Sequence, residues 1–449
     1  MTITEKKDIF DKSKLGSIKK TLKKDLLTIN QKTEEKIQSA HFKEQINIIK
    51  TNYGIQEAFN TVKYLQVALN LRKPELAIYD HTFHLIGGGQ KYGLTIANAL
   101  KNIFNITIIS NKKITHEDIR TWYNLDLSDC IIKIIPIPFF EDMNLTHLDP
   151  NHINKNIENP FHIISKESGN YDFFINNSMN EMVYPLANKS IMICHFPERR
   201  PVSYFYSERY TYTVYNSKYT ASWIKKRWKY TPHKHIYPPV DMQLSKEKIE
   251  KENIILSVAR FEESGSKKQI EMIRTFININ KSYPDKLKDW KLILVGGSPK
   301  TNKYLDQISN LLSEYNEYNI EIKINISGDK LKSLYKKSKI FWHLCGLNQT
   351  DPSLIEHFGM TIVEAMQNNI VPIVFDGGGQ KEIVNHNECG YRVNSTKELM
   401  KHTINLIQNP NLITELSQNA LLKSKQFSRE IFETNIKKFF SDILKDYIL

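Results

Sequence analysis

Between residues 75 and 445, short apolar runs alternate with stretches whose apolar residues recur every three or four positions. The short runs, such as NITIIS at 105–110, predict buried strands, and the periodic stretches, such as YLDQISNLLSEY at 304–315, predict helices. This alternation is typical of a parallel α/β sheet. It restarts after KHIYPPVD at 234–241, so the sequence predicts two Rossmann-like halves joined near Pro238-Pro239.

Each half has its own set of predicted elements. In the first half we expect strands within 75–83, 105–110, 171–178, 190–196 and 212–217, and a helix within 87–103 that follows a glycine turn. In the second half we expect strands within 253–261, 290–297, 320–327, 339–346 and 370–379, and helices within 267–276, 304–315 and 360–367.

The first 74 residues are mostly polar and predict helices. One of these helices has an apolar stripe formed by Leu15, Ile18, Leu22, Leu26 and Ile29. Four lysines lie outside this stripe (Lys14, Lys20, Lys23 and Lys24), and Lys19 lies close to it. Such a helix either packs on another surface, the body of the protein or a second subunit, or lies on an anionic membrane. We favour the packed arrangement.

The domain bounds follow from these patterns. We expect a basic helical extension at 1–74, an N-terminal domain at 75–243 and a C-terminal domain at 244–425. A final helix at 426–449 is expected to pack back on the N-terminal domain.

The net charge of +13 is partly local, because residues 1–73 carry fifteen Lys and Arg against eight Asp and Glu. A basic protein binds nucleic acid, an anionic membrane surface or a phosphorylated ligand. The sequence has no zinc-finger, RRM or helix-turn-helix pattern, so we expect no nucleic-acid partner.

Cysteine usage and hydropathy indicate the compartment. The four cysteines (Cys130, Cys194, Cys345, Cys389) show no C-x-x-C spacing, which argues for a reducing compartment and against a disulfide framework or zinc site. The longest apolar stretch, IIKIIPIPFF at 131–140, is about half a membrane span, and no signal-peptide h-region follows the N-terminus. We therefore expect a cytoplasmic protein, with residues 1–74 as the candidate contact to a partner or to the membrane's cytoplasmic face.

The stretch EHFGMTIVEAM at 356–366 holds two carboxylates among apolar residues, where burial without partners is costly. Thr361 and Glu364 fit a capping box, which predicts a helix beginning at Met360–Thr361 and a structural role for Glu364. A helix N-terminus also suits a phosphate. One carboxylate on each side of such a site fits a diphosphate ligand flanked by hydroxyls, as in a nucleotide sugar.

The E-x7-E spacing resembles the signature of retaining glycosyltransferases of family 4. The resemblance spans most of residues 75–445 through six segments in the same order: GGGQKYGLTIANAL (87–100), ICHFPERRPVSYF (193–205), YNSKYTASWIKKRW (215–228), IYPPVD (236–241), SVARFEESGSKKQIEMIRTF (257–276) and the segment 346–384. The EHFG and GGQ combination is closest to bacterial polysaccharide-type members and is similar to mannosyltransferases that extend dolichol-linked oligosaccharides. The resemblance to this family implies a GT-B fold, in which two Rossmann-like domains face each other across a cleft that holds the active site.

The resemblance also implies roles for individual residues. Arg260 and Lys267 would neutralise the donor diphosphate, with Lys268 as a substitute for Lys267 because EESGS lengthens the loop. Glu356 would bind the donor sugar and stabilise cationic character at its anomeric carbon, and Glu364 would hold the ribose. The donor contacts would include Phe358, Gly359, Met360 and Thr361 at the helix start and Gly88, Gly89 and Gln90 in the first glycine loop.

Other positions have competing interpretations. His195 either lies near the donor sugar or is a structural histidine at a strand end whose hydrogen bonds are satisfied within the fold. The sequence favours neither interpretation. Arg260 and Lys267 would be ordinary surface cations without the motif around them. The segment Asp376-Gly377-Gly378-Gly379 is expected to be a strand-to-helix turn rather than a ligand contact. Base contacts are expected near 324–329, where no residue distinguishes UDP from GDP.

The implied reaction is front-face transfer with retention, in which the leaving diphosphate accepts the acceptor's proton. No D-x-D occurs in the sequence, so we expect no divalent metal and no cofactor beyond the nucleotide-sugar donor. The acceptor is a glycan, a lipid-linked glycan or a protein.

Three alternatives remain. The evidence for a dinucleotide-binding oxidoreductase is weak. Gly87, Gly89 and Gly93 give the pattern G-x-G-x-x-x-G, which is one residue longer than the usual glycine fingerprint. A sugar-nucleotide epimerase would share the fold but needs an acid/base carboxylate set that the sequence does not show. The third alternative is a non-catalytic binding subunit. The presence of Glu356, Glu364, Arg260 and Lys267 together argues against it, because binding alone does not require all four.

Overall fold

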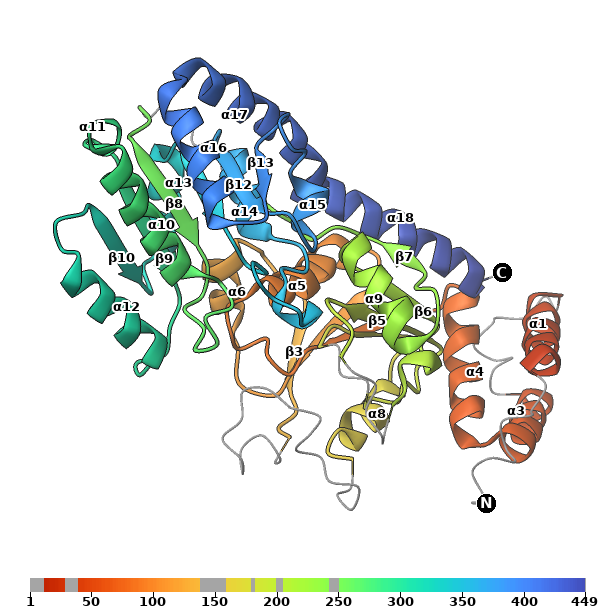
Figure 1. Cartoon of the computed structure of the whole chain (residues 1–449). Helices are drawn as coiled ribbons and strands as arrows, with labels where there is room; N and C mark the ends of the chain where they lie inside the picture. The colour runs from red at the N-terminus through yellow and green to blue at the C-terminus, as the bar shows by residue number, and fades with distance from the viewer. Residues whose placement is uncertain are drawn as a thin grey trace. The chain divides into compact units, whose positions relative to one another are not determined.

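The computed structural model describes residues 12–28, 39–137, 159–178, 182–198, 205–241 and 250–448 (Figure 1). The chain forms two compact units. The first lies within residues 1–193, 199–214 and 434–449, and the second within 194–198 and 215–433. The N-terminal helices are thus part of the first unit, and the division after residue 214 differs from the expected boundary at 243.

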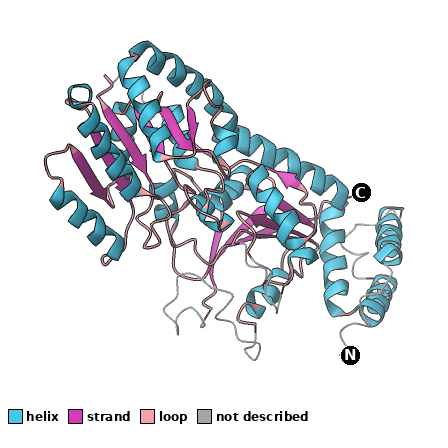
Figure 2. Cartoon of the chain, viewed as in Figure 1, coloured by secondary structure: helices cyan, strands magenta, loops and turns pink. Residues whose placement is uncertain are grey.

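The first sheet has the strand order β3-β2-β1-β4-β5-β6-β7. Figure 2 colours the strands of the chain magenta and its helices cyan. Its strands are β1 (Glu75–Tyr79), β2 (Asn105–Ser110), β3 (Ile131–Ile134), β4 (Phe173–Asn176), β5 (Lys189–Cys194), β6 (Tyr212–Tyr215) and β7 (Lys234–His235). The β1–β2, β1–β4, β2–β3 and β4–β5 pairs are parallel. This is the doubly wound order that the alternating pattern predicts.

The helices of the first unit are α1 (Lys12–Thr28), α3 (Ala40–Tyr53), α4 (Ile55–Ala68), α5 (Gly88–Leu100), α6 (His116–Tyr123) and α8 (His162–Ser168), with the short η2 (Ser207–Arg209). The final helix, α18 (Arg429–Ile448), has its residues from Thr434 onward in this unit. Among the described residues, no helix is both long and apolar enough to cross a membrane.

The N-terminal helices pack on the body of the first unit. Leu15, Leu22 and Leu26 of the apolar stripe on α1 are buried and Ile18 is half-buried, which supports the packed interpretation for the described part of that stripe. Ile29 lies outside the described residues. On α4, the buried Lys63 ammonium donates to the carbonyls of Gly169 and Tyr171, each at 2.7 Å.

A second contact joins the same segment to β4 and to the C-terminal helix. The guanidinium of Arg72 contacts both carboxylate oxygens of the fully buried Asp172, with Nη2–Oδ1 at 2.9 Å. The hydroxyl of Tyr447 donates to the same carboxylate at 3.3 Å. Residues 63 and 72 are therefore bound into the core of the first unit.

The second sheet is built from parallel strands in the order β10-β9-β8-β11-β12-β13. The strands are β8 (Ile254–Val258), β9 (Lys291–Gly296), β10 (Ile320–Ile324), β11 (Ile340–His343), β12 (Val371–Phe375) and β13 (Tyr391–Val393). The helices of this unit are α9 (Lys218–Trp228), α10 (Gln269–Ser282), α11 (Pro284–Leu287), α12 (Lys303–Glu314), α13 (Gly328–Lys337), α14 (Met360–Gln367), α15 (Gln380–Ile383), α16 (Thr396–Gln408) and α17 (Pro410–Ser424), with η3 (Pro352–Leu354) and η4 (Lys425–Phe427).

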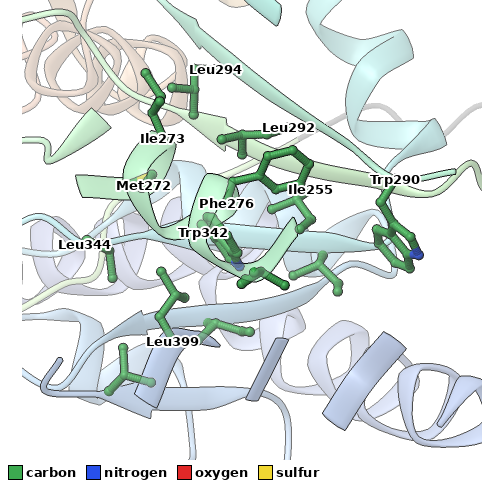
Figure 3. Close-up of a cluster of buried hydrophobic side chains, with 14 of the residues drawn as sticks. Ile255, Met272, Ile273, Phe276, Trp290, Leu292, Leu294, Trp342, Leu344 and Leu399 are labelled. Atoms are coloured by element: carbon green, nitrogen blue, oxygen red, sulfur yellow. The ribbon is translucent and has the colours of Figure 1, made fainter. Parts of the chain in front are cut away.

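Alternate residues of these strands enter two different cores, because successive side chains point to opposite faces of a sheet. Ile255, Leu292 and Trp342 pack against Phe276 of α10 and Leu399 of α16 in the cluster shown in Figure 3. On the other face, Leu256, Ile293 and Phe341 join Tyr335 of α13 and Ile362 of α14. Both faces of the sheet are covered, which explains the continuous apolar runs in the sequence.

Most predicted elements are present, with shorter strands than the apolar runs. The strand at 105–110 and the helix at 360–367 have the expected bounds. Several elements were not predicted. They are β3, whose residues were treated only as an apolar stretch, β7 and β13, and the helices α6, α8, α11, α13, α16 and α17.

Candidate functional site

Glu356 lies on the loop between β11 and α14, and the backbone of this loop is held by a glycine turn. The turn, Gly377-Gly378-Gly379, joins β12 to α15 as predicted. The Gly379 N–H donates to the Glu356 carbonyl at 2.8 Å. A Cβ on Gly378 would lie 2.2 Å from that carbonyl oxygen, and one on Gly379 would lie 2.2 Å from the His357 carbonyl. The position of Glu356 therefore depends on close backbone contact that only glycine permits.

The Glu356 carboxylate has two nitrogen partners. Its Oε2 atom lies 3.1 Å from Lys267 Nζ and 3.0 Å from His343 Nε2. The side chains of Lys267 and Glu356 are 18% and 19% exposed, and that of His343 is 2% exposed. Burial alone would raise the pKa of Glu356, but Lys267 and the His343 hydrogen bond hold it well below its usual range.

Lys267 is correspondingly held as a cation. Burial opposes its charge, but the Glu356 carboxylate raises its pKa above the usual value. The Lys267 ammonium also donates to Cys345 Sγ at 3.6 Å, and this thiol donates to the Leu354 carbonyl at 3.5 Å. Burial and the nearby carboxylate raise the pKa of Cys345 to about 12, so the thiol is protonated near neutral pH.

The loop from 259 to 268 brings only one of its three expected cations to this carboxylate. Lys267 reaches Glu356, whereas Lys268 pairs with Glu271 at 3.4 Å. The Arg260 side chain is 76% exposed and contacts Glu262 at 3.0 Å. The geometry thus assigns the half-buried ion pair to Lys267 and leaves Arg260 extended toward solvent.

Helix α14 begins at Met360 as predicted, but the capping box is wrong. The N-cap residue is Gly359, with φ of 113° and no side-chain cap hydrogen bond. This start places Glu364 beyond the first turn of the helix. Instead, the Tyr335 hydroxyl donates to Glu364 Oε2 at 3.0 Å.

The other donor residues expected at this helix have different environments. Phe358 is buried, with its ring among Tyr237 and Phe427, so its side chain belongs to the core. Met360 and Thr361 are half-buried in the first turn of α14, where helix N–H groups have no intrahelical acceptor.

His195 belongs to the second unit, on the segment 194–198. The next residue, Phe196, stacks on the ring of His357 with centroids 4.0 Å apart and planes 6° from parallel. Burial lowers the pKa of His357 to about 4, so this ring is neutral near pH 7. The stack places the His195 segment against the loop that carries Glu356.

The glycine loop belongs to the first unit. Helix α5 begins at Gly88, and the Gly89 carbonyl accepts from Asn177 Nδ2 at 2.9 Å. The Gln90 side-chain amide donates to the Thr82 hydroxyl. Gln90 is thus engaged inside this unit, and the loop is anchored to the carboxyl end of β4.

Sequence reasoning missed His343, Cys345 and Tyr335. The first two lie at and just beyond the carboxyl end of β11, the edge of an α/β sheet where ligands bind. Their positions in FWHLCG could have identified them once that strand end was predicted. Tyr335 could not be found in this way, because it lies 29 residues before Glu364 and on a different helix.

Residues 241–423 match the family model described as Glycosyl transferases group 1. Two relatives carry the name GDP-Man:Man(3)GlcNAc(2)-PP-Dol alpha-1,2-mannosyltransferase. The protein from Dictyostelium discoideum is 25% identical over 298 residues, covering 63% of this chain and 56% of its own. The protein from Xenopus laevis is 30% identical over 237 residues, covering 49% and 46%. The chain thus spans about half the length of the curated relatives it matches.

Solved structures show the same architecture. A glycosyltransferase from Rickettsia africae superposes with a TM-score of 0.63 at 17% identity, covering 83% of this chain and 99% of that one. A protein from Anabaena, solved with UDP and glucose, gives 0.60 at 14% identity, covering 82% and 100%. At these identities the likeness concerns the fold, and it confirms the predicted GT-B class of two Rossmann-like units.

Proposed function

We propose that this chain is a retaining glycosyltransferase that moves a hexose from a nucleotide-diphosphate sugar to a glycan, lipid-linked or protein acceptor. The observation that carries the proposal is the contact of the half-buried Lys267 and the buried His343 with Glu356, beside the start of α14. Such an ion group, at the carboxyl edge of a doubly wound sheet, is a preorganised electrostatic site. The group 1 family match and the names of the relatives support this activity.

Each side chain has a proposed role. Lys267, with Arg260 from the same loop, offsets the charge that develops on the departing diphosphate. Glu356 is ionised near neutral pH and stabilises positive charge at the anomeric carbon. The amides of Gly359, Met360 and Thr361 approach the phosphates, and Glu364 accepts hydrogen bonds from the ribose hydroxyls. His195 would contact the donor sugar, and Gly88, Gly89 and Gln90 the diphosphate.

The proposed step is a front-face displacement. The bond from the anomeric carbon to the diphosphate oxygen breaks, and a bond from the same face to the acceptor oxygen forms. The acceptor's proton moves to the departing diphosphate oxygen, so the configuration is retained without a protein nucleophile. We propose no metal for this step, because the Lys267 ammonium supplies the positive charge beside Glu356.

Donor and acceptor are proposed from the relatives. Both curated relatives are named for transfer of mannose from a GDP donor to a dolichol-linked oligosaccharide, so GDP-mannose is the first donor to test. A lipid-linked acceptor would bring the chain to the cytoplasmic face of a membrane. The N-terminal helices, whose buried stripe faces the body, would present their basic residues there.

Two other functions use the same fold. A sugar-nucleotide epimerase would convert the donor without an acceptor, and a binding subunit would hold a ligand without turnover. The buried ion group favours a transferase over a binding subunit, because binding alone does not need an ionised carboxylate that is half-enclosed beside a cation.

The test is donor binding and turnover by the full chain in the presence of a chelator. We expect one nucleotide sugar to bind by calorimetry without added metal, and NMR of the product to show the donor's anomeric configuration. Glu356→Gln should lower turnover by about 10²- to 10³-fold while donor binding persists. Glu415→Gln, on an exposed position of α17, is the matched control. Absence of binding by all nucleotide sugars would refute the proposal, and an inverted product would refute the mechanism.

A further inference from the structure

Three potential metal ligands of different chemistry meet beside Lys267. The ligand atoms of His343, Cys345 and Glu356 all lie within 4.8 Å of one another. This is the one such group of three His, Cys, Asp or Glu side chains in the described part of the chain. The proposed transfer gives the Cys345 thiol no task, so the cluster contains more metal-binding chemistry than that reaction needs.

We propose that His343, Cys345 and Glu356 form an inhibitory site for a soft divalent cation, with zinc as the first candidate. The inference rests on the proposed function, because inhibition requires that Glu356 and Lys267 act in donor turnover. Nitrogen, sulfur and carboxylate oxygen are the ligands that zinc uses, and three protein ligands leave one position open. No C-x-x-C spacing marks this site, because its ligands converge from β11 and the loop after it.

The structure already holds a cation among these ligands. Lys267 Nζ lies 3.1 Å from Glu356 Oε2 and 3.6 Å from Cys345 Sγ. Zinc at this position would compete directly with the ammonium. Displacement requires the half-buried Lys267 side chain to move its ammonium out of the cluster.

Binding requires two changes in the ligands. The Cys345 thiol releases its proton to solvent as the metal–sulfur bond forms. The His343 Nε2 atom, which contacts Glu356 without metal, turns its lone pair to the cation, and the ring proton resides on Nδ1. That Nδ1 atom is buried without a hydrogen-bond partner among the described residues, so the metal–nitrogen bond must offset the cost of an unpaired N–H there.

Inhibition follows from the same contacts. The metal would occupy the Glu356 carboxylate and remove Lys267 from the position where it faces the donor diphosphate. Both effects act on one step, so zinc should compete with the nucleotide-sugar donor.

Cobalt titration of the full-length chain, with reduced thiols and without any sugar, tests the site directly. We expect a thiolate-to-cobalt absorption band that zinc abolishes. Cys345→Ser should lose this band, and its affinity for cobalt should fall at least about tenfold. Cys389 is another buried thiol of the same unit, and Cys389→Ser should keep both the band and the affinity. A band of equal intensity in Cys345→Ser, or no cobalt binding by the wild-type chain, would overturn the proposal.

A second variant separates the cluster from its resident cation. Lys267→Ala should bind cobalt at least about tenfold more tightly, because the competing charge is gone. Lys268→Ala is the adjacent control, since that ammonium pairs with Glu271. Unchanged affinity in Lys267→Ala would refute direct competition.

The two proposals fail in different assays. Donor binding in chelator tests the transferase without metal, and the cobalt titration tests the cluster without donor. Zinc should raise the apparent donor KM of the wild-type chain and leave that of Cys345→Ser unaffected. Metal binding that never competes with the donor would overturn the inhibitory role.

Discussion

The Nε2 atom of His343 lies 3.0 Å from the Glu356 Oε2 atom that Lys267 also contacts. One carboxylate oxygen thus has two nitrogen partners, one from the end of β11 and one from the loop before α10. The carboxylate is held in a fixed direction before any ligand arrives. This arrangement gives His343 a positioning role, since it acts on the donor through Glu356.

Replacing His343 should therefore affect turnover more than donor binding. We expect His343→Leu to lower kcat by about 10- to 100-fold with a smaller change in donor KM, by analogy with lost supporting hydrogen bonds at metal sites. His343→Gln retains an N–H donor and should recover part of the loss. His402→Gln, on a half-buried ring that packs on Tyr391, is the control. Steady-state kinetics decide, and equal losses in the Leu and Gln variants would contradict the role.

The Tyr335–Glu364 hydrogen bond should act on donor affinity instead. Tyr335→Phe removes the hydroxyl that fixes the Glu364 carboxylate, so the donor Kd should rise about 3- to 10-fold, the value of one ordinary hydrogen bond. Tyr304→Phe is matched, because that buried hydroxyl accepts from the Ile270 N–H. Calorimetry with the nucleotide alone suffices, and equal affinity in the two variants would exclude a ribose contact through Glu364.

Gly359 should not accept a side chain. Its φ of 113° lies where side-chain-bearing residues are strained, and a Cβ would lie 2.7 Å from Ile362 Cδ1. We expect Gly359→Ala to lower the free energy of unfolding by about 1–3 kcal/mol and to weaken donor binding. Gly328→Ala, at the first position of α13, meets no atom within 4 Å and should be neutral or stabilising. Denaturant unfolding compares the two, and a neutral Gly359→Ala would show that the loop conformation is not required.

Lys63 makes stability depend on pH. Burial lowers its pKa to about 8, whereas in the unfolded chain the value is about 10.4. Between these values the unfolded state binds more protons, so stability rises with pH across this window. Between pH 8 and about 10.4, the free energy of unfolding of the wild-type chain should rise by on the order of 2 kcal/mol relative to that of Lys63→Met. A difference that stays constant, or falls, over this range would contradict the buried ammonium.

The sequence predicted the second sheet well, because strands buried on both faces leave continuous apolar runs such as IILSV at 254–258. It also identified Glu356 and Lys267, which the fold brings together across 89 residues. It could not predict the Glu364 environment, because the local capping pattern competes with a tertiary partner, Tyr335. β3 was missed because the apolar stretch that begins with it, IIKIIPIPFF, was weighed only as a possible membrane span. At the edge of the sheet its residue Ile131 is exposed.

The contacts of Lys63 and Arg72 have a practical consequence for truncation. Deleting the N-terminal helices would remove the ammonium from the carbonyls of Gly169 and Tyr171 and the guanidinium from the buried Asp172. A buried carboxylate without its cation is strongly destabilising. Expression of a shortened chain would therefore report on misfolding rather than on recruitment, and the surface chemistry of α1 and α3 must be tested by exchanging exposed lysines one at a time.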